Sequence, residues 1–192
     1  MLCKSCSVAK LQYSAICSVD GFMADEQGNF DWAAPDEQVH AFVNELESGI
    51  GTHLYGRRMY EVMRVWEEQE WLDDEPDVVR DYARIWGLAD KHVFSETLDS
   101  VSTARTRLHR TFDPAAITQL KASSARDISI GGATLAAHAM RAGLVDEFHL
   151  VIVPVLVGGG TSVMPLGIRL NLELIDMRRF DSGFVHLHYR TA

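Results

Sequence analysis

Short apolar runs alternate with stretches of helical spacing along most of the chain. The runs are too short for helices, and the glycines and polar residues around them are typical of buried strands. Such strands are expected at residues 11–19, 52–55, 91–94 and 128–130, within 101–108, and at 146–157, where Pro154 interrupts the run. Helices are expected where apolar residues recur every three or four positions, at residues 36–48, 59–66, 76–86, 114–122 and 133–140.

The C-terminal end has a different pattern. Residues 170–180 and 184–189 flank Asp181-Ser182-Gly183, which predicts an antiparallel hairpin. Because strands and helices alternate before this hairpin, the sequence predicts an α/β fold with a mostly parallel sheet and an antiparallel edge. A length of 192 residues suits one domain. We expect this domain to span residues 11–192, after a disordered segment at 1–10.

Two glycines stand where a strand meets a helix. The run Ile128-Ser129-Ile130 ends in Gly131-Gly132, and helical spacing begins at Ala133. Glycine lets a ligand approach the backbone, and the free N–H groups at a helix start favour an anion such as a phosphate. A tight turn between strand and helix explains the same two glycines equally well.

A second strand also enters a helix through a glycine, and here two arginines follow it. The sequence reads Gly56-Arg57-Arg58. Arginine pairs bidentately with phosphate, and cations at a helix N-terminus are unfavourable without a balancing anion. A bound phosphate is therefore expected, with a surface ion pair to nearby carboxylates as the alternative.

These turns are expected to lie close together. In an open sheet, ligands bind beyond the carboxyl ends of the strands. The segments that follow Val19, Tyr55, Phe94 and Ile130 all stand at strand ends. We therefore expect them to converge on one crevice.

A long loop follows the first strand and carries exposed aromatic residues. It contains several carboxylates, Phe30 and Trp32, and it ends at Pro35. Loops of this kind often close over a ligand. Anchoring of the loop to the core by Trp32 is the alternative. Substrate specificity is expected to come from this loop and from residues 66–86.

Composition narrows the class of partner. A net charge of −9 argues against a nucleic-acid or anionic membrane surface, while a few local arginines can still hold a small anion. No apolar stretch reaches the roughly 20 residues that a membrane span needs, and no signal peptide is evident. We expect a cytoplasmic protein that acts on a small molecule.

Cysteine and histidine give no metal signature in the sequence. Cys3 and Cys6 have C-x-x-C spacing, but no second pair or nearby histidine accompanies them. Cys17 makes a third cysteine, and the eight histidines are scattered along the chain. No metal site is expected.

Neither a G-x-G-x-x-G fingerprint nor a P-loop is present. A set of short motifs runs instead from about Leu11 to Tyr189. The motifs are Ser18-Val19-Asp20-Gly21, Phe30-Asp31-Trp32, Gly56-Arg57-Arg58 with Tyr60, Phe94-Ser95-Glu96-Thr97-Leu98, Ile130-Gly131-Gly132-Ala133, Gly143-Leu144-Val145-Asp146-Glu147, Pro154-Val155-Leu156 with Gly158 to Gly160, and Ser182-Gly183. In this order they resemble the dihydrofolate reductase-like superfamily, and within it the reductase domain of bacterial riboflavin-biosynthesis deaminase-reductases and its stand-alone relatives.

The resemblance implies a mixed sheet of about eight strands flanked by helices, with NADPH bound across the strand ends. The implied contacts of the pyrophosphate and adenosine 2′-phosphate are Gly56, Arg57, Arg58 and Ser95, and the pyrophosphate also contacts Gly131, Gly132, Ala133 and Thr134. The implied contacts of the nicotinamide amide are Ala15 and Ile16. The residues implied on the substrate side are Asp20, Gly21, Phe30, Trp32 and Tyr60.

One position departs from the family pattern. Relatives often carry a basic residue after the serine, whereas Glu96 stands here and would repel a 2′-phosphate. NADH therefore remains open as the cofactor. The chain lacks the H-x-E and P-C-x-x-C signature of zinc deaminases, which excludes a bifunctional deaminase-reductase.

The resemblance also implies a function. By analogy with folate-reducing members, Glu37 beside Asp36 is a candidate proton donor, although helix capping explains both residues, and Asp20 is a second candidate. We expect an NADPH-dependent oxidoreductase that transfers a hydride to a small heterocyclic or carbonyl substrate, similar to 5-amino-6-(5-phosphoribosylamino)uracil reductase. A homodimer is expected through residues 148–157 and the C-terminal hairpin. The alternatives are dihydrofolate reductase activity and a non-catalytic nucleotide-binding or dimerising module.

Overall fold

The computed structural model describes residues 8–192, apart from the side chain of Gln69. Its strands are β1 (Leu11–Ser18), β2 (Phe22–Ala24), β3 (Ile50–Gly56), β4 (Asp90–Phe94), β5 (Thr106–His109), β6 (Asp127–Gly131), β7 (Glu147–Val153), β8 (Thr161–Ser162), β9 (Leu172–Arg179) and β10 (Val185–Thr191). Its helices are α1 (Glu37–Ser48), α2 (Arg57–Met63), α3 (Gln69–Leu72), α4 (Asp77–Leu88), α5 (Pro114–Ser123) and α6 (Ala133–Arg141), with short 3₁₀ helices η1 (Asp31–Ala33) and η2 (Arg64–Glu67).

Eight strands form one sheet in the order β5-β4-β3-β6-β1-β7-β10-β9, and β2 pairs with β8 in a small second sheet. The six strands from β5 to β7 are parallel to one another, and β10 is antiparallel to both of its neighbours. The mostly parallel sheet with an antiparallel C-terminal hairpin is therefore confirmed. Since the six parallel strands end at one edge of the sheet, we call the residues that directly follow their carboxyl ends the strand-end rim.

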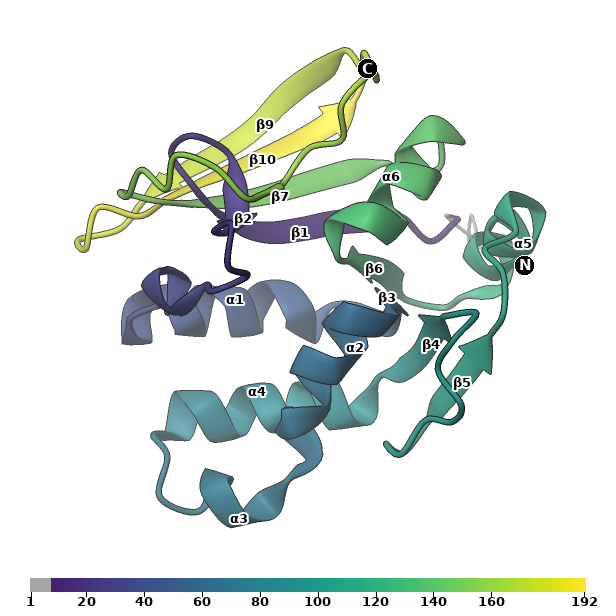
Figure 1. Cartoon of the computed structure of the whole chain (residues 1–192), viewed down its shortest axis with the longest axis horizontal. Coiled ribbons are helices and arrows are strands. Elements are labelled where there is room, and N and C mark those ends of the chain that lie inside the picture. Colours follow the sequence, from purple (N-terminus) through teal and green to yellow (C-terminus); the bar gives the residue numbers. More distant parts are fainter. Residues whose placement is uncertain (1–7) are drawn as a thin grey trace, which may run out of the picture.

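Helices cover both faces of this sheet (Figure 1). On one face, Ile117 of α5 and Leu135 of α6 join a core with Leu11 and Ile130. On the other face, Val39 of α1 packs against the outer part of the sheet, and α4 packs beside α1. Within residues 8–192, no helix has both the length and the apolar character that crossing a membrane requires.

Two expected elements differ from the structure. The strand expected at 146–157 ends at Val153, because Pro154 has no N–H to donate to a ladder. The residues beyond it leave the sheet, and Leu156 is 75% exposed. The helix expected at 59–66 begins at Arg57 and narrows to a 3₁₀ helix from Arg64.

The N-terminal segment is described only from residue 8. Ala9 is buried, and its N–H donates to the carbonyl of Lys121. The expected disorder of residues 1–7, together with Cys3 and Cys6, lies outside the described residues and stays a prediction. Cys17 is buried in β1 as a free thiol.

Gly160 fixes the contact between the triple-glycine loop and the end of β2. Its φ is +126°, and a Cβ built there would lie 2.1 Å from the carbonyl oxygen of Ala24. Gly28 also has a positive φ of +87°, but a Cβ there meets nothing within 4 Å. Alanine at Gly28 would therefore introduce backbone strain alone, whereas alanine at Gly160 would add a steric overlap with Ala24.

We predict that Gly160→Ala destabilises the fold more than Gly28→Ala. Gly28→Ala should cost about 1–2 kcal/mol from the left-handed backbone alone. Gly160→Ala adds an overpacking cost of about 1–3 kcal/mol. Urea unfolding of both variants measures the difference, and equal losses would show that the loop moves away from β2 without cost.

Candidate functional site

Two strand-to-helix turns meet at the strand-end rim. β3 and β6 are neighbours, and their register pairs Tyr55 with Gly131. The turn at Gly56 therefore stands beside the turn at Gly132, and a Cβ on Gly56 would lie 3.8 Å from Leu135 of α6. The N-termini of α2 and α6 converge as the sequence predicts.

Gly131 and Gly132 are required by this close approach. A Cβ on Gly131 would lie 3.0 Å from the ring of Tyr55, and one on Gly132 would lie 3.3 Å from Met59. Gly132 also has a φ of +90°, which disfavours any residue with a side chain. The tight-turn interpretation of the double glycine therefore holds, because Tyr55 and Met59 occupy the space that side chains at these two positions would need.

The helices at the rim begin without side-chain caps. Asp36 caps α1 by accepting from Val39 N at 2.9 Å, and Asp113 caps α5 by accepting from Ala115 N at 2.9 Å. Gly56 and Gly132 precede α2 and α6 and offer no such oxygen. The first N–H groups of α6, including those of Ala133 and Thr134, are thus available to an outside acceptor.

The sheet separates between β1 and β6 next to these turns. β1 pairs with β7 from Gln12 to Ser18, but it pairs with β6 only from Leu11 to Tyr13. Ile128 N donates to the Lys10 carbonyl, so the alternation of a parallel ladder directs the N–H and C=O of Ile16 toward the β6 side. That side has no strand partner at Ile16, and Ala15 and Ile16 are both half-buried.

Two exposed arginines follow β3. Arg57 donates to Glu61 Oε1 at 2.8 Å and to Thr97 Oγ1 at 3.1 Å. The surface ion pair offered as an alternative is thus formed by Arg57, and Glu61 raises the pKa of its guanidinium. Arg58 makes no hydrogen bond or ion pair with residues 8–192 and remains free for a ligand.

A third arginine, which the sequence analysis missed, lies against the loop after β4. Ser95 is buried, and its Oγ accepts from the N–H of Leu98 at 2.9 Å, so this hydroxyl closes a local turn. Arg110 donates to the carbonyls of Ser95, Glu96 and Leu98. Arg110 follows the end of β5, as Arg57 follows β3, which is the signal that could have found it. Its positive charge partly offsets the exposed Glu96.

Asp20 holds two loops together at the end of β1. Its carboxylate accepts from Val157 N at 3.1 Å and from Gly158 N at 2.7 Å. A hydrogen bond from Ser18 and those from the backbone lower the pKa of Asp20 to about 2. The group therefore stays ionised at neutral pH and anchors the 157–158 segment, and its catalytic role stays a prediction.

The other residues of the substrate side border the same end of β1. Phe30 is 46% exposed, and Gly21 follows Asp20 with a φ of +83°. Trp32 packs with Ile16 in the core beneath α1, and its buried Nε1 has no acceptor among the described residues. Trp32 therefore anchors the loop to the core, as the alternative interpretation expected. Glu37 is exposed in the first turn of α1.

Tyr60 lies in the core rather than on the rim. It is only 2% exposed, and its hydroxyl accepts from Ser102 N at 2.8 Å and from Thr103 N at 3.2 Å. Tyr60 therefore supports the 102–103 segment. Its expected place at the substrate is not favoured by this position, because the hydroxyl is already satisfied.

The family model of the RibD C-terminal domain matches residues 9–186. The chain belongs to this family. The uncharacterized protein YyaP of Bacillus subtilis (strain 168) is 30% identical over 176 residues, which cover 90% of this chain and 89% of YyaP.

Solved structures share the fold. A putative riboflavin biosynthesis protein from Shewanella sp. PV-4 superposes with a TM-score of 0.73 at 20% identity, covering 95% of this chain and 99% of the other. Dihydrofolate reductase from Enterococcus faecalis, complexed with NADP(H), gives a TM-score of 0.60 at 12% identity, covering 95% and 96%. The dihydrofolate reductase-like fold and its RibD C-terminal branch are confirmed.

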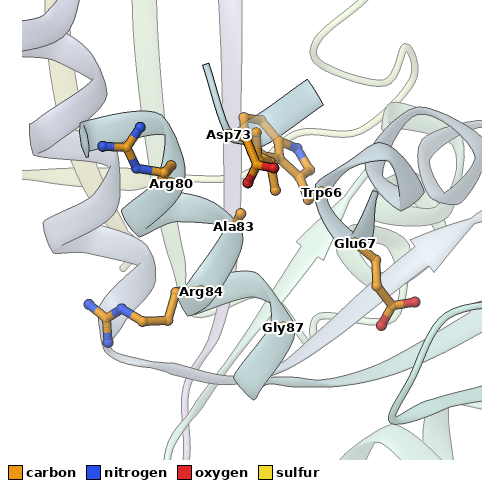
Figure 2. A pocket seen from close by; sticks show the side chains of 8 residues that line it. Trp66, Glu67, Asp73, Arg80, Ala83, Arg84 and Gly87 are labelled. Atoms are coloured by element: carbon orange, nitrogen blue, oxygen red, sulfur yellow. The ribbon is translucent and has the colours of Figure 1, made fainter. Parts of the chain in front are cut away.

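A hollow on this RibD C-terminal domain lies away from the strand-end rim. It has a volume of about 380 Å³ and is formed by residues from η2 to α4. Figure 2 shows Arg80 and Arg84 extending from α4 on one side and Glu67 on the other. Its lining falls within the 66–86 segment expected to set specificity, apart from one flanking residue, Gly87. None of these residues follows a strand, so the hollow is separate from the two helix N-termini.

The histidines of this domain are not scattered as the sequence suggests. His149, His186 and His188 stack on one another beside Glu147. The expectation of dispersed histidines is therefore wrong for these three. They come together because β7 and β10 pair across the sheet.

A buried carboxyl group lies between α1 and β3 in this domain. Burial raises the pKa of Glu47 to about 7 and lowers that of His53 to about 3. His53 Nδ1 stands 3.8 Å from Glu47 Oε2, but the imidazole is neutral at neutral pH, so this contact is not an ion pair. Ionising Glu47 therefore costs stability.

We predict that the wild type loses stability as pH rises and Glu47 is driven to ionise, and that Glu47→Gln does not show this loss. Unfolded Glu47 ionises near its ordinary pKa of 4.5, while the folded group holds its proton to about pH 7. The free energy of unfolding of the wild type should thus fall relative to the variant as pH rises from 4.5 to 7, by about 3 kcal/mol, and then level off. Urea unfolding at pH 4.5, 6 and 8 measures this gap. The titration of His53 occurs in both proteins and cancels, so a constant gap would contradict the assignment.

Proposed function

We propose that this RibD C-terminal domain protein is an NADPH-dependent reductase that transfers a hydride to a small heterocyclic or carbonyl substrate. The observation that carries the proposal is the meeting of two uncapped helix N-termini, those of α2 and α6, beside the gap between β1 and β6. A pyrophosphate suits the helix ends, and a planar ring suits the gap. Both places lie at the strand-end rim.

The residues at the rim fit such a dinucleotide. The turn at Gly131 and Gly132 brings the N–H groups of Ala133 and Thr134 to the rim, where a pyrophosphate can accept hydrogen bonds from them. The unpaired N–H and C=O of Ile16 suit the amide of a nicotinamide ring, because that amide carries both a donor and an acceptor. Adjacent Ala15 points to the opposite face of the sheet and offers no bulk there.

The choice of NADPH over NADH rests on charge. Arg57 and Arg110 donate hydrogen bonds to the turn at residues 95–98, where the adenosine phosphate would lie, and Arg58 follows Arg57 at the start of α2. Arg58 is the strongest candidate for the 2′-phosphate because its guanidinium is not engaged by residues 8–192. Glu96 opposes this phosphate, but the hydrogen bonds from Arg110 place a compensating charge beside it.

The bound dinucleotide supplies the hydride. The chain supplies position and exclusion of water, and the loop with Phe30 and Trp32 suits this role because it borders the end of β1. Trp32 anchors this loop by packing with Ile16 in the core beneath α1. Asp20 remains ionised, so Glu37 or solvent is the better proton source.

We also propose that the protein acts as a homodimer in the cell interior, with the hairpin edge as the interface. β7 is paired on both sides, so it cannot supply an edge. β9 is the outermost strand, and Leu174, Ile175 and Met177 are between 43% and 61% exposed. This edge is the part of the predicted dimer face that remains open to a partner.

We predict that Arg58→Ala weakens NADPH binding by about 10–100-fold, since a charge-assisted contact contributes about 1.5–3 kcal/mol. Arg57→Ala with Arg58→Ala should weaken it further. NADH, which lacks the 2′-phosphate, should lose much less affinity. Calorimetric titration of both nucleotides measures these changes.

Arg84→Ala is the matched control, since Arg84 is an exposed arginine on α4 that pairs with Asp81. It should bind both nucleotides as the wild type does. Equal losses of NADPH and NADH in Arg58→Ala would contradict the 2′-phosphate contact. Absence of NADPH binding by the wild type would overturn the reductase proposal, and binding without oxidation of NADPH by any small carbonyl or heterocycle would favour a non-catalytic module.

A further inference from the structure

Three histidines and a glutamate share one face of two strands, β7 and β10, which are neighbours in the sheet (Figure 1). Glu147 and His149 alternate along β7, and His186 and His188 alternate along β10. The register pairs His188 directly with His149. Alternation and register together bring the four side chains to one place on the face that α1 partly covers.

The ligand atoms of three of these residues face one another. Glu147 Oε2 lies 3.4 Å from His188 Nε2 and 3.9 Å from His149 Nε2. All three atoms fall within 4.8 Å of one another. Both histidine nitrogens are buried and have no hydrogen-bond partner among residues 8–192. Two imidazole nitrogens without a hydrogen-bond partner among residues 8–192 are thus directed at one carboxylate oxygen.

The fourth residue orients one of these imidazoles. His149 Nδ1 lies 3.1 Å from His186 Nε2. If Nδ1 of His149 donates this hydrogen bond, its Nε2 presents a lone pair toward Glu147. A metal-binding histidine is commonly held in this way, with its second ring nitrogen donating to a neighbouring acceptor. His186 is therefore a positioning residue.

Lys10 does not occupy the carboxylate oxygen that faces the imidazoles. Its ammonium pairs with the other carboxylate oxygen, Glu147 Oε1, and its side chain is 55% exposed. The negative charge of Glu147 is thus partly balanced by Lys10 through Oε1, while Oε2 remains directed at the two imidazoles. The side chain of His188 is 19% exposed, although its Nε2 is buried.

We propose that Glu147, His149 and His188 bind one divalent transition-metal ion of the zinc class. Two nitrogens and one carboxylate oxygen suit zinc, cobalt or nickel, whereas magnesium and calcium prefer oxygen ligands throughout. A water molecule would supply the fourth ligand of a tetrahedral ion.

The spacing is close to what such an ion needs. Ligand distances of about 2.0–2.2 Å in a tetrahedron place neighbouring ligand atoms about 3.4 Å apart. The contact from Glu147 to His188 already has this length at 3.4 Å, and the contact to His149 at 3.9 Å must shorten. The two rings stack with centroids 4.1 Å apart and planes 20° apart, so the His149 ring must rotate out of the stack before the planes of both rings contain the ion.

This site is separate from the strand-end rim. Glu147 is the first residue of β7, and Val153 at the carboxyl end is six residues further on. At about 3.3 Å per residue the two ends are about 20 Å apart. A metal ion here ties β7 to β10 and takes no part in hydride transfer.

The test measures Zn²⁺ and Co²⁺ binding to tag-free protein that has been treated with a chelator. All proteins carry Cys3→Ser and Cys6→Ser, because the C-x-x-C run could bind zinc by itself. Zn²⁺ affinity is measured by competition with a chromophoric chelator, and the visible spectrum of Co²⁺ reports tetrahedral nitrogen and oxygen ligation. Far-ultraviolet circular dichroism confirms that each variant is folded.

The ligand variants are Glu147→Gln and His188→Gln, and the matched control is His109→Gln. His109 stacks on His92 with centroids 4.8 Å apart and planes 13° apart, and its other stacking neighbour is Phe94 rather than a carboxylate. The control thus removes one histidine from a stacked pair that offers no third ligand.

We expect one equivalent of Zn²⁺ to bind, with affinity reduced about 100-fold in both ligand variants and unchanged in His109→Gln. His186→Phe should reduce affinity by about 10–100-fold, as loss of a supporting hydrogen bond does, and should alter the Co²⁺ spectrum. Absence of stoichiometric Zn²⁺ binding, or equal affinity in His188→Gln and His109→Gln, would overturn the proposal. NADPH titration of the same variants should be unchanged, which keeps this test independent of the proposed reductase function.

Discussion

The structure depends on the limited pairing between β1 and β6. β1 is hydrogen-bonded to β7 along almost its whole length but to β6 over only three residues. β6 ends at Gly131 and turns into α6 while β1 continues, so the backbone of Ile16 is left without a strand partner on that side. Packing of Gly131 against Tyr55 and Met59 holds the turn in this place. A continuous ladder at Ile16 would close the gap that a planar ligand needs.

The convergence of the rim could be predicted from the sequence, but the gap could not. Parallel strands end at one edge of a sheet, so the double glycine and the paired arginines had to meet there once the strands were correctly placed. How far two strands remain paired depends on twist and on the packing of the helices that follow them. No residue of β1 indicates in the sequence that its pairing with β6 stops at Tyr13. Arg110 was missed for a related reason, because β5 is short and only weakly patterned.

The histidine cluster shows the same limit in another part of the sheet. Glu147 and His149 stand two residues apart, as do His186 and His188, and that spacing places each pair on one face of its strand. The spacing was visible in the sequence. The pairing of β7 with β10 was not, because 36 residues lie between His149 and His186, and the antiparallel register is set by the hairpin as a whole. Pro154, by contrast, was noticed, but its effect was underestimated: it ends β7 and sends residues 154–157 toward Asp20.

β7 links the two candidate sites without joining them chemically. At its carboxyl end the chain passes into the segment that Asp20 holds through Val157 and Gly158, on the substrate side of the rim. At its amino end it carries Glu147 and His149. A central strand with ladders on both sides is rigid along its length, so the proposed ion at the amino end would strengthen the pairing of β7 with β10 and leave the rim geometry unchanged. Stability would then be added at the amino end of β7, while the carboxyl ends of the strands keep the open backbone that the proposed dinucleotide site needs.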